Sequence, residues 1–204
     1  AADRHLKPGG VFYIWHAGTE GFNFISAVRD TGWEFKQVLI WNKNNMVLGR
    51  QDYQWKHEPC LYGWKPGAGH YFIDSRSQLT VYQNEAGEID PEKMTKAELV
   101  ELVKKIGQIP TDIIDEDKPL RSADHPTMKP LKLMGRCVKN STRPGEVVLD
   151  SFGGSGSTLM ACEQLGRVCF TVELDPHYVD VIIKRWEEYT QDKAQYLGNI
   201  NDGK

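Results

Sequence analysis

Residues 146–178 read EVVLDSFGGSGSTLMACEQLGRVCFTVELDPHY, and this stretch decides the fold. An apolar run at 147–149 ends in Asp150 and predicts a short buried strand, which a glycine-rich turn follows at 152–156. The next residues predict a helix that stops at Gly166, where a left-handed cap is expected. A second apolar run at 168–172 ends in Glu173. Strand, glycine turn, helix, strand and acid in this order predict half of a nucleotide-binding α/β sheet.

The glycine turn limits the kinds of ligand that this half-sheet can hold. Glycines allow positive φ and let a ligand lie against the backbone, and the helix that follows offers unpaired N–H groups to an anion. A phosphate-binding loop needs a lysine that is absent here, and the dinucleotide fingerprint needs a glycine where Leu159 stands. Glu173 is placed to accept the hydroxyls of a ribose. These features favour an adenosine ligand with a small anionic end, and S-adenosylmethionine (SAM) fits that description.

Length and composition indicate a globular protein. The 204 residues suit one domain, with 40% hydrophobic and 26% charged residues. No apolar run is long enough to span a membrane, and no signal-peptide pattern is present. The four cysteines lack metal-ligand spacing, so we interpret them as reduced structural thiols and expect no metal ion. A cytoplasmic location in a bacterium or a phage-infected host follows as the expectation.

Charge is distributed unevenly along the chain. Residues 36–65 carry five bases against two acids, and residues 118–144 carry seven bases against one acid. Residues 84–117 carry ten acids against four bases. Basic stretches of this kind can form surfaces that bind phosphates even when the net charge is −3.

The first half of the chain continues the α/β pattern. Strands are predicted at 11–16, 35–41 and 60–62, and shorter extended pieces at 70–73 and 79–82. A helix between the first two strands should bury Phe22, Ile25 and Val28 and end near Gly32.

Three further helices are predicted after residue 83. Residues 84–110 contain a capping box and an apolar helical face, and we interpret them as an inserted acidic helix. A helix near Pro130 should turn Leu131, Met134 and Val138 inward. A last helix begins at Pro176, and the C-terminal residues form a frayed tail.

Four motifs together resemble one protein family. These are LKPGGVFYIWH at 6–16, HPTMKP at 125–130, DSFGGSGST at 150–158 and VELDPHY at 172–178. In this order they resemble the permuted β class of DNA amino-methyltransferases, which methylate adenine N6 or cytosine N4. The stretch NKNNMVLGRQDYQWKHEPCLYGWKPG at 42–67 further resembles phage and prophage members. The resemblance implies a Rossmann-like SAM-dependent sheet with helices on both faces, as one domain over 1–204.

The resemblance also implies two sets of site residues. The cofactor-binding residues would be His125, Thr127, Lys129, Asp150, Phe152, Gly154, Gly156, Ser157 and Glu173. A hairpin at 43–56 would contact double-stranded DNA through Lys43, Asn44, Asn45, Arg50, Gln51, Tyr53, Gln54 and Lys56. For the segment 125–130, a helix-entry turn is an equally good interpretation. An exposed hairpin without a nucleic-acid role is the alternative for 43–56.

The family's catalytic motif, [DSN]-P-P-[YFW], does not occur in the chain. The tetrapeptide at 175–178 resembles it only superficially, because it opens the helix after the second cofactor strand. The catalytic residues are therefore unknown, and we expect a missing N-terminal segment or a second chain to supply them. A homodimer is also open. Methylation of adenine N6 is favoured over cytosine N4 by family frequency alone. The alternatives are a non-catalytic module that binds DNA or cofactor, and a nicotinamide-dependent dehydrogenase, which Leu159 disfavours.

Overall fold

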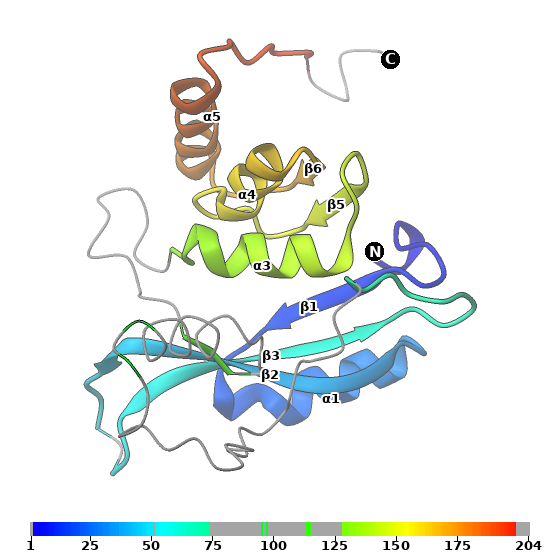
Figure 1. Ribbon diagram of the computed structural model, residues 1–204, viewed down its shortest axis with the longest axis vertical. Helices are drawn as coiled ribbons and strands as arrows, with labels where there is room; N and C mark the ends of the chain where they lie inside the picture. Colours follow the sequence, from blue (N-terminus) through cyan, green and yellow to red (C-terminus); the bar gives the residue numbers. More distant parts are fainter. Residues whose placement is uncertain are drawn as a thin grey trace. The chain divides into compact units, whose positions relative to one another are not determined.

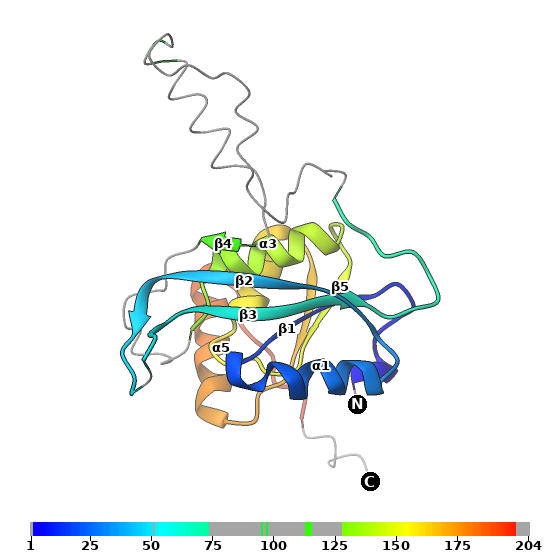
Figure 2. The ribbon, with the colours of Figure 1, turned by 90° about the horizontal axis from the view of Figure 1, so that it is seen from below.

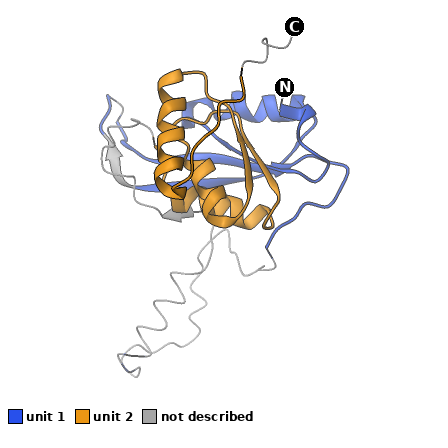
Figure 3. Ribbon diagram, turned by 90° about the horizontal axis from the view of Figure 1, so that it is seen from above, with its two compact units in different colours: residues 1–117 blue, residues 118–204 orange. Residues whose placement is uncertain are grey.

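A computed structural model describes residues 2–50, 52–73, 95, 97, 113–115 and 128–198. Of residues 44–47 and 113–115 it describes the backbone alone. The chain divides into two compact units, Ala1–Asp117 and Lys118–Lys204, and each is considered by itself (Figure 3). No helix among the described residues has the length and apolar character needed to cross a membrane.

The first unit is built on a four-stranded sheet (Figure 1). Its elements are η1 (Ala2–Arg4), β1 (Val11–Trp15), η2 (Gly18–Glu20), α1 (Gly21–Asp30), β2 (Glu34–Val47), β3 (Trp55–Trp64) and β4 (Ile113–Asp115). The strand order is β1-β3-β2-β4, with β3 antiparallel to both its neighbours and β4 parallel to β2. Because β3 lies between β1 and β2, the hairpin β2–β3 folds back beside the first strand.

Helix α1 lies along one face of this sheet (Figure 2). The buried core joins Phe12 of β1, Val28 of α1 and Leu61 of β3, with Phe24 and Ile25 packed against it. The helix and the inward positions of Ile25 and Val28 were predicted correctly, but that of Phe22 was not, because Phe22 is 82% exposed. Phe22 stands in the first helical turn, and the inward position there belongs to Phe24, whose ring stacks on His16.

Strands β2 and β3 are longer than the apolar runs that predict them. β2 continues through the polar residues 42–47, where Asn42 pairs with His57 and Val47 pairs with Trp55 across an irregular register. Pairing with β3 at Asn42 and at Val47 carries the strand through this segment, which no local pattern could indicate. Residues 70–73 form no strand, and His70 instead stacks on Trp64 with ring centroids 3.7 Å apart. The predicted piece at 79–82 lies outside the described residues, as does the inserted helix at 84–110 apart from Thr95 and Ala97.

The second unit contains the stretch at 146–178 that decides the fold. Its elements are α3 (Leu131–Ser141), β5 (Val147–Asp150), α4 (Ser157–Leu165), β6 (Val168–Thr171) and α5 (Pro176–Thr190). β5 and β6 are parallel, with Val147 opposite Val168 and Asp150 opposite Thr171. The helix between them ends at Gly166, which has φ 67° and donates its N–H to the helix carbonyls, as predicted.

The prediction that the strand at 147–149 is buried was wrong. Val147 and Leu149 are exposed, and so are Val168, Phe170 and Val172 on the neighbouring strand segment. The register places these residues on one face, because Val147 pairs with Val168 and Leu149 pairs with Phe170. The opposite face carries Val148 and Cys169, and α4 lies against it. One face of β5–β6 is therefore apolar and uncovered.

Helix α3 buries Val138 as predicted, but its other buried positions differ from the predicted ones. Its buried residues are Leu133, Cys137 and Val138, whereas Leu131 and Met134 are only partly buried. Packing against α4 decides this orientation, since Leu133 and Cys137 stand one turn apart.

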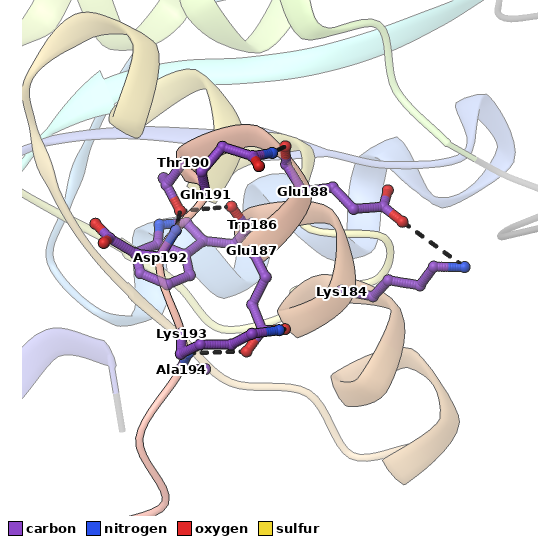
Figure 4. A network of polar contacts seen from close by, with 9 residues as sticks. All are labelled: Lys184, Trp186, Glu187, Glu188, Thr190, Gln191, Asp192, Lys193 and Ala194. Carbon is purple, nitrogen blue, oxygen red and sulfur yellow. Dashed lines mark hydrogen bonds and ion pairs between the residues drawn. The ribbon is translucent and has the colours of Figure 1, made fainter.

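Helix α5 has well-formed ends. Asp175 caps its start by accepting a hydrogen bond from the His177 N–H at 2.9 Å, and Pro176 occupies the first turn. Polar contacts tie its last turn to the following residues, as Figure 4 shows: Lys193 Nζ lies 2.9 Å from Glu187 Oε2, and Glu187 Oε1 accepts from the Ala194 N–H. Residues 192–198 have no regular secondary structure, and the predicted tail at 197–204 lies outside the described residues apart from Leu197 and Gly198.

Candidate functional site

The turn after β5 is held by hydrogen bonds at both of its ends. Asp150 Oδ1 accepts from the Phe152 N–H at 3.1 Å, which starts the turn. The Gly153 N–H donates to the Val172 carbonyl at 2.8 Å and so links the turn to the end of β6. The Phe152 ring is left 89% exposed beside the turn. The turn is therefore rigid in its backbone and open to solvent at one aromatic side chain.

Helix α5 supports this turn from behind. Gly156, which has φ 78° and immediately precedes α4, lies so close to Ile182 that a Cβ atom would be 3.1 Å from Ile182 Cγ1. A Cβ on Gly153 would lie 2.6 Å from Thr171 Oγ1. Glycine is thus required here by packing as well as by backbone conformation.

Glu173 spans the gap between the two strand ends. Its Oε2 accepts from the Gly154 N–H at 2.6 Å, and its Oε1 accepts from the Asp175 N–H at 3.0 Å. A carboxylate offers about four acceptor sites, and these two bonds fix its orientation. The acid is therefore fixed in orientation at the place where ligands bind in open α/β sheets, beside the carboxyl ends of the strands.

The segment before α3 is attached to the first turn of α4. Ser157 Oγ donates to the Lys129 carbonyl at 2.9 Å, so residues 128–130 lie beside the glycine turn. His125 and Thr127 lie outside the described residues. Within the described part of the chain, the predicted cofactor residues come together as one group: Lys129, Asp150, Phe152, Gly154, Gly156, Ser157 and Glu173. Their assignment to a cofactor stays a prediction.

Sequence reasoning missed Arg185. Its guanidinium donates to the Ser155 carbonyl, so α5 contributes a charged group to the glycine turn. The signal was present in the sequence, because Arg185 stands three residues after the inward-facing Ile182 and therefore shares its side of the helix.

Two of the thiols in the second unit have raised pKa values. Burial raises the pKa of the Cys137 thiol to about 12. A hydrogen bond with Cys162, together with burial, raises the pKa of the Cys169 thiol as well. None of the four cysteines forms a disulfide, and Cys169 is only partly buried whereas the other three are buried. Among the described residues no group of three or more His, Cys, Asp or Glu side chains could hold a metal ion.

The predicted DNA hairpin corresponds to the end of β2, a loop and the start of β3. Lys43 is paired at the base of this hairpin: its Nζ lies 3.0 Å from Glu58 Oε2 and 5.1 Å from the centre of the Trp41 ring. Trp55 packs edge-on to His57 and also meets Gly18, where a Cβ would come within 2.8 Å of its ring. The base of the hairpin is thus an ordered aromatic and ionic cluster.

The tip of the hairpin is exposed. Arg50 and Tyr53 of the loop are exposed, Tyr53 to 90%, and Lys56 at the start of β3 is exposed as well. Gln54 Oε1 accepts from the Gly49 N–H at 2.7 Å and so holds the loop. The backbone of Asn44 and Asn45 lies in β2, and Gln51 is outside the described residues. This part of the hairpin therefore combines cations with an exposed aromatic ring, as surfaces that bind nucleic acids do.

Comparison with protein families matches residues 1–185 to the N6/N4 methyltransferases, described as DNA methylases. The chain belongs to this DNA methylase family. The match includes both the hairpin and the glycine turn, so the two units described above are parts of one family pattern.

Two relatives of the chain are type II methyltransferases. M.Cfr9I of Citrobacter freundii is 27% identical over 159 residues, which cover 78% of this chain and 46% of that protein. M2.DpnII of Streptococcus pneumoniae is 24% identical over 187 residues, which cover 89% of this chain and 62% of that protein. The chain thus spans about half to three-fifths of the length of these two relatives.

Solved structures of DNA methyltransferases share the fold of this chain. The crystal structure of M1.HpyAVI in complex with SAM has a TM-score of 0.64 at 23% identity and covers 88% of this chain and 76% of its own. PvuII DNA methyltransferase, which is cytosine-N4-specific, also has a TM-score of 0.64, at 17% identity and with 89% and 65% covered. The α/β, Rossmann-like methyltransferase fold predicted from the sequence is confirmed by these similarities.

Proposed function

We propose that the protein carrying this chain is a DNA methyltransferase that moves a methyl group from SAM to an exocyclic amino group of double-stranded DNA. The observation that carries the proposal is Glu173, held by two backbone N–H groups across the glycine turn. Membership of the DNA methylase family supports the reaction, and the SAM complex of M1.HpyAVI supports the cofactor.

The residues around the turn fit SAM by their chemistry. Glu173 is an oriented acceptor for ribose hydroxyls, and the exposed ring of Phe152 is free to stack on a base. The N-terminus of the nine-residue helix α4 favours an anionic group such as the carboxylate of the methionine part. When bound, SAM would supply an activated methyl group. The role of this chain is to hold and orient that donor. We propose the same role for Lys129, Asp150, Gly154, Gly156 and Ser157.

We propose that the hairpin at 43–56 contacts the DNA. The exposed Arg50 and Lys56 suit phosphates or guanine edges, and Tyr53 suits stacking or insertion between bases. The ion pair of Lys43 with Glu58 supports a further role for Lys43 in holding the base of the hairpin.

We propose that the catalytic motif comes from polypeptide outside these 204 residues. The chain contains no Pro-Pro pair, and both curated relatives are considerably longer than the part that matches. The uncovered apolar face of β5–β6, formed by Val147, Leu149, Val168, Phe170 and Val172, is the kind of surface that a further element covers. The catalytic motif could come from further sequence of the same protein or from a second chain, and these two sources are to be distinguished. A homodimer is a third arrangement to test.

The target base and the biological setting are finer proposals. We favour adenine N6 over cytosine N4, and we place the protein in the permuted β class, in the cytoplasm of a bacterium or a phage-infected host. The type II methyltransferases among its relatives support a role beside a restriction enzyme.

The test uses the full-length protein that contains this chain. Isothermal titration calorimetry measures SAM binding, and transfer of radioactive methyl to duplex DNA measures activity. Mass spectrometry of the digested nucleosides then separates N6-methyladenine from N4-methylcytosine. Failure of the folded full-length protein to bind SAM would refute the proposed function.

A matched pair of variants tests the carrying observation. Glu173→Gln removes the charge from two charge-assisted hydrogen bonds and from the expected ribose contacts, so we expect the Kd for SAM to rise about 10- to 100-fold. Glu163→Gln is the control, because it makes the same chemical change at an exposed hydrogen bond. Among the bonds described, Glu163 Oε2 accepts from the Trp186 indole N–H alone, at 3.0 Å. Equal SAM affinity of both variants would remove Glu173 from the site.

A second candidate is a non-catalytic module that binds DNA or cofactor. The absence of the Pro-Pro motif from these residues favours it. The same assays decide: SAM or DNA binding without methyl transfer by the full-length protein supports the module, and methyl transfer excludes it.

A further inference from the structure

Helix α5 has a side that faces the glycine turn. Ile182 is buried against Gly153 and Gly156, and Arg185, three residues later, reaches the Ser155 carbonyl. Ile182 and Arg185 share one side of the helix because residues three apart are neighbours on its surface. The turn is therefore shaped from behind by one apolar and one charged side chain of the same helix.

The peptide group between Ser155 and Gly156 is fixed at both of its polar atoms. Its carbonyl accepts from Arg185, and its N–H, that of Gly156, donates to the Gly153 carbonyl at 2.8 Å. A peptide group held at both atoms cannot rotate without losing two hydrogen bonds. Its orientation sets the entry into α4, whose first backbone turn begins at the next residue.

The Ser155 carbonyl needs this partner. Ser155 is only 4% exposed, and a buried carbonyl without a hydrogen bond is costly. Without the guanidinium, the favourable response is rotation of the 155–156 peptide toward water, which would redirect the Gly156 N–H and disturb the positive φ of Gly156. The guanidinium also places a positive charge beside the N-terminus of α4, where an anionic ligand group is favoured.

We propose that Arg185 is a positioning residue for the methyl donor: it holds the 155–156 peptide in the orientation in which the glycine turn accepts SAM. This inference rests on the proposed function, because it concerns the same cofactor site. Arg185 acts through the Ser155 carbonyl and need not touch SAM itself.

The test compares Arg185→Met with Lys184→Met in the full-length protein. Lys184 is the matched control, because it is the neighbouring basic residue and its side chain is 76% exposed. Its Nζ lies 3.9 Å from Glu188 Oε1 on the outer side of α5 (Figure 4). Calorimetry measures the Kd for SAM, a turnover assay measures kcat at saturating SAM, and a thermal melt without ligand measures Tm.

We expect Arg185→Met to raise the Kd for SAM about tenfold and to leave kcat at saturating SAM within about twofold. Lys184→Met should leave both unchanged. Arg185→Lys keeps the charge and one donor, so its Kd should lie between, about threefold above that of the wild type. This split between binding and turnover separates positioning from a general loss of structure.

Three results overturn the inference. One is a Kd of Arg185→Met equal to that of the wild type. Another is a loss of affinity that Arg185→Lys does not restore and that follows the fall in Tm. If Arg185→Met does not fold, Arg185→Lys becomes the deciding variant. The third result that overturns the inference is then a Kd of Arg185→Lys equal to that of the wild type. Wild-type protein that binds no SAM would instead refute the proposed function, and the inference with it, before any variant is compared.

Discussion

The contact between Gly156 and Ile182 yields a sharp prediction about stability. Substitution of Gly156 by alanine adds a Cβ in a left-handed conformation, at φ 78°, and places it 3.1 Å from Ile182 Cγ1 and 3.3 Å from Ile182 Cγ2. The first effect costs about 1–2 kcal/mol. The second is overpacking against a buried side chain, which costs about 1–3 kcal/mol. We therefore expect Gly156→Ala to lower the free energy of unfolding of the second unit by about 2–5 kcal/mol.

Gly166 provides the matched control for this prediction. It has a similar φ of 67°, but a Cβ there would meet no atom within 4 Å. Gly166→Ala should therefore show the conformational cost alone, about 1–2 kcal/mol. The difference between the two variants measures the packing of Ile182 against the turn.

Hydrogen exchange followed by mass spectrometry suits this comparison. The chain has two compact units, so a single melting curve would mix their transitions, whereas exchange reports the opening of the peptides from α4 directly. The same substitution in an Ile182→Ala background should cost no more than Gly166→Ala, because the crowding atoms are gone. Equal costs for Gly156→Ala and Gly166→Ala in the wild-type background would refute the tight contact.

Three further predictions concern other parts of the chain. A hydrogen bond from the Trp33 indole and the ammonium of Lys65 lower the pKa of Asp3 below 3.8. This stabilisation is present above pH 3.8 and disappears as the pH falls through the lowered pKa. Asp3→Asn should therefore lower the urea midpoint at pH 6, and its difference from the wild type should shrink as the pH falls below 3.8. The double variant Arg50→Ala with Lys56→Ala should weaken binding to all duplex sequences alike. The slope of the logarithm of the DNA-binding constant against the logarithm of the salt concentration should fall in magnitude by about 2. An unchanged slope in a filter-binding assay would exclude phosphate contacts by these two residues. The buried Cys137 thiol, with a pKa of about 12, should resist iodoacetamide at pH 8 in the native protein and react after unfolding, as mass spectrometry would show.

The local features of the second unit could be predicted from sequence because they depend on local chemistry. Gly166 ends α4 because a left-handed cap strongly favours a residue without a Cβ. Asp150 and Glu173 were placed at strand ends by the apolar runs before them, and their hydrogen bonds to the turn agree with that placement. The same local logic located α5, whose start is marked by Asp175 and Pro176.

Predictions failed where a residue's surroundings come from distant parts of the chain. Periodicity showed that the runs at 147–149 and 168–172 are apolar, but burial depends on whether another element covers the face, and here Val147 and Phe170 are exposed. Polar residues 42–47 extend β2 because β3 pairs with them. Phe22, Leu131 and Met134 were predicted to be more buried than they are, because the direction from which a neighbouring element packs is not contained in helical spacing.

By itself, then, the sequence determined the order of strand, glycine turn, helix and acid, since turns, caps and apolar runs act over a few residues. The tertiary structure alone decided that Glu173 bridges the two strand ends and that Arg185, thirty residues after Ser155 along the chain, holds the carbonyl of that serine. Such contacts arise when separate helices and strands pack together. Their partners are chosen by the geometry of packing rather than by the pattern of neighbouring residues.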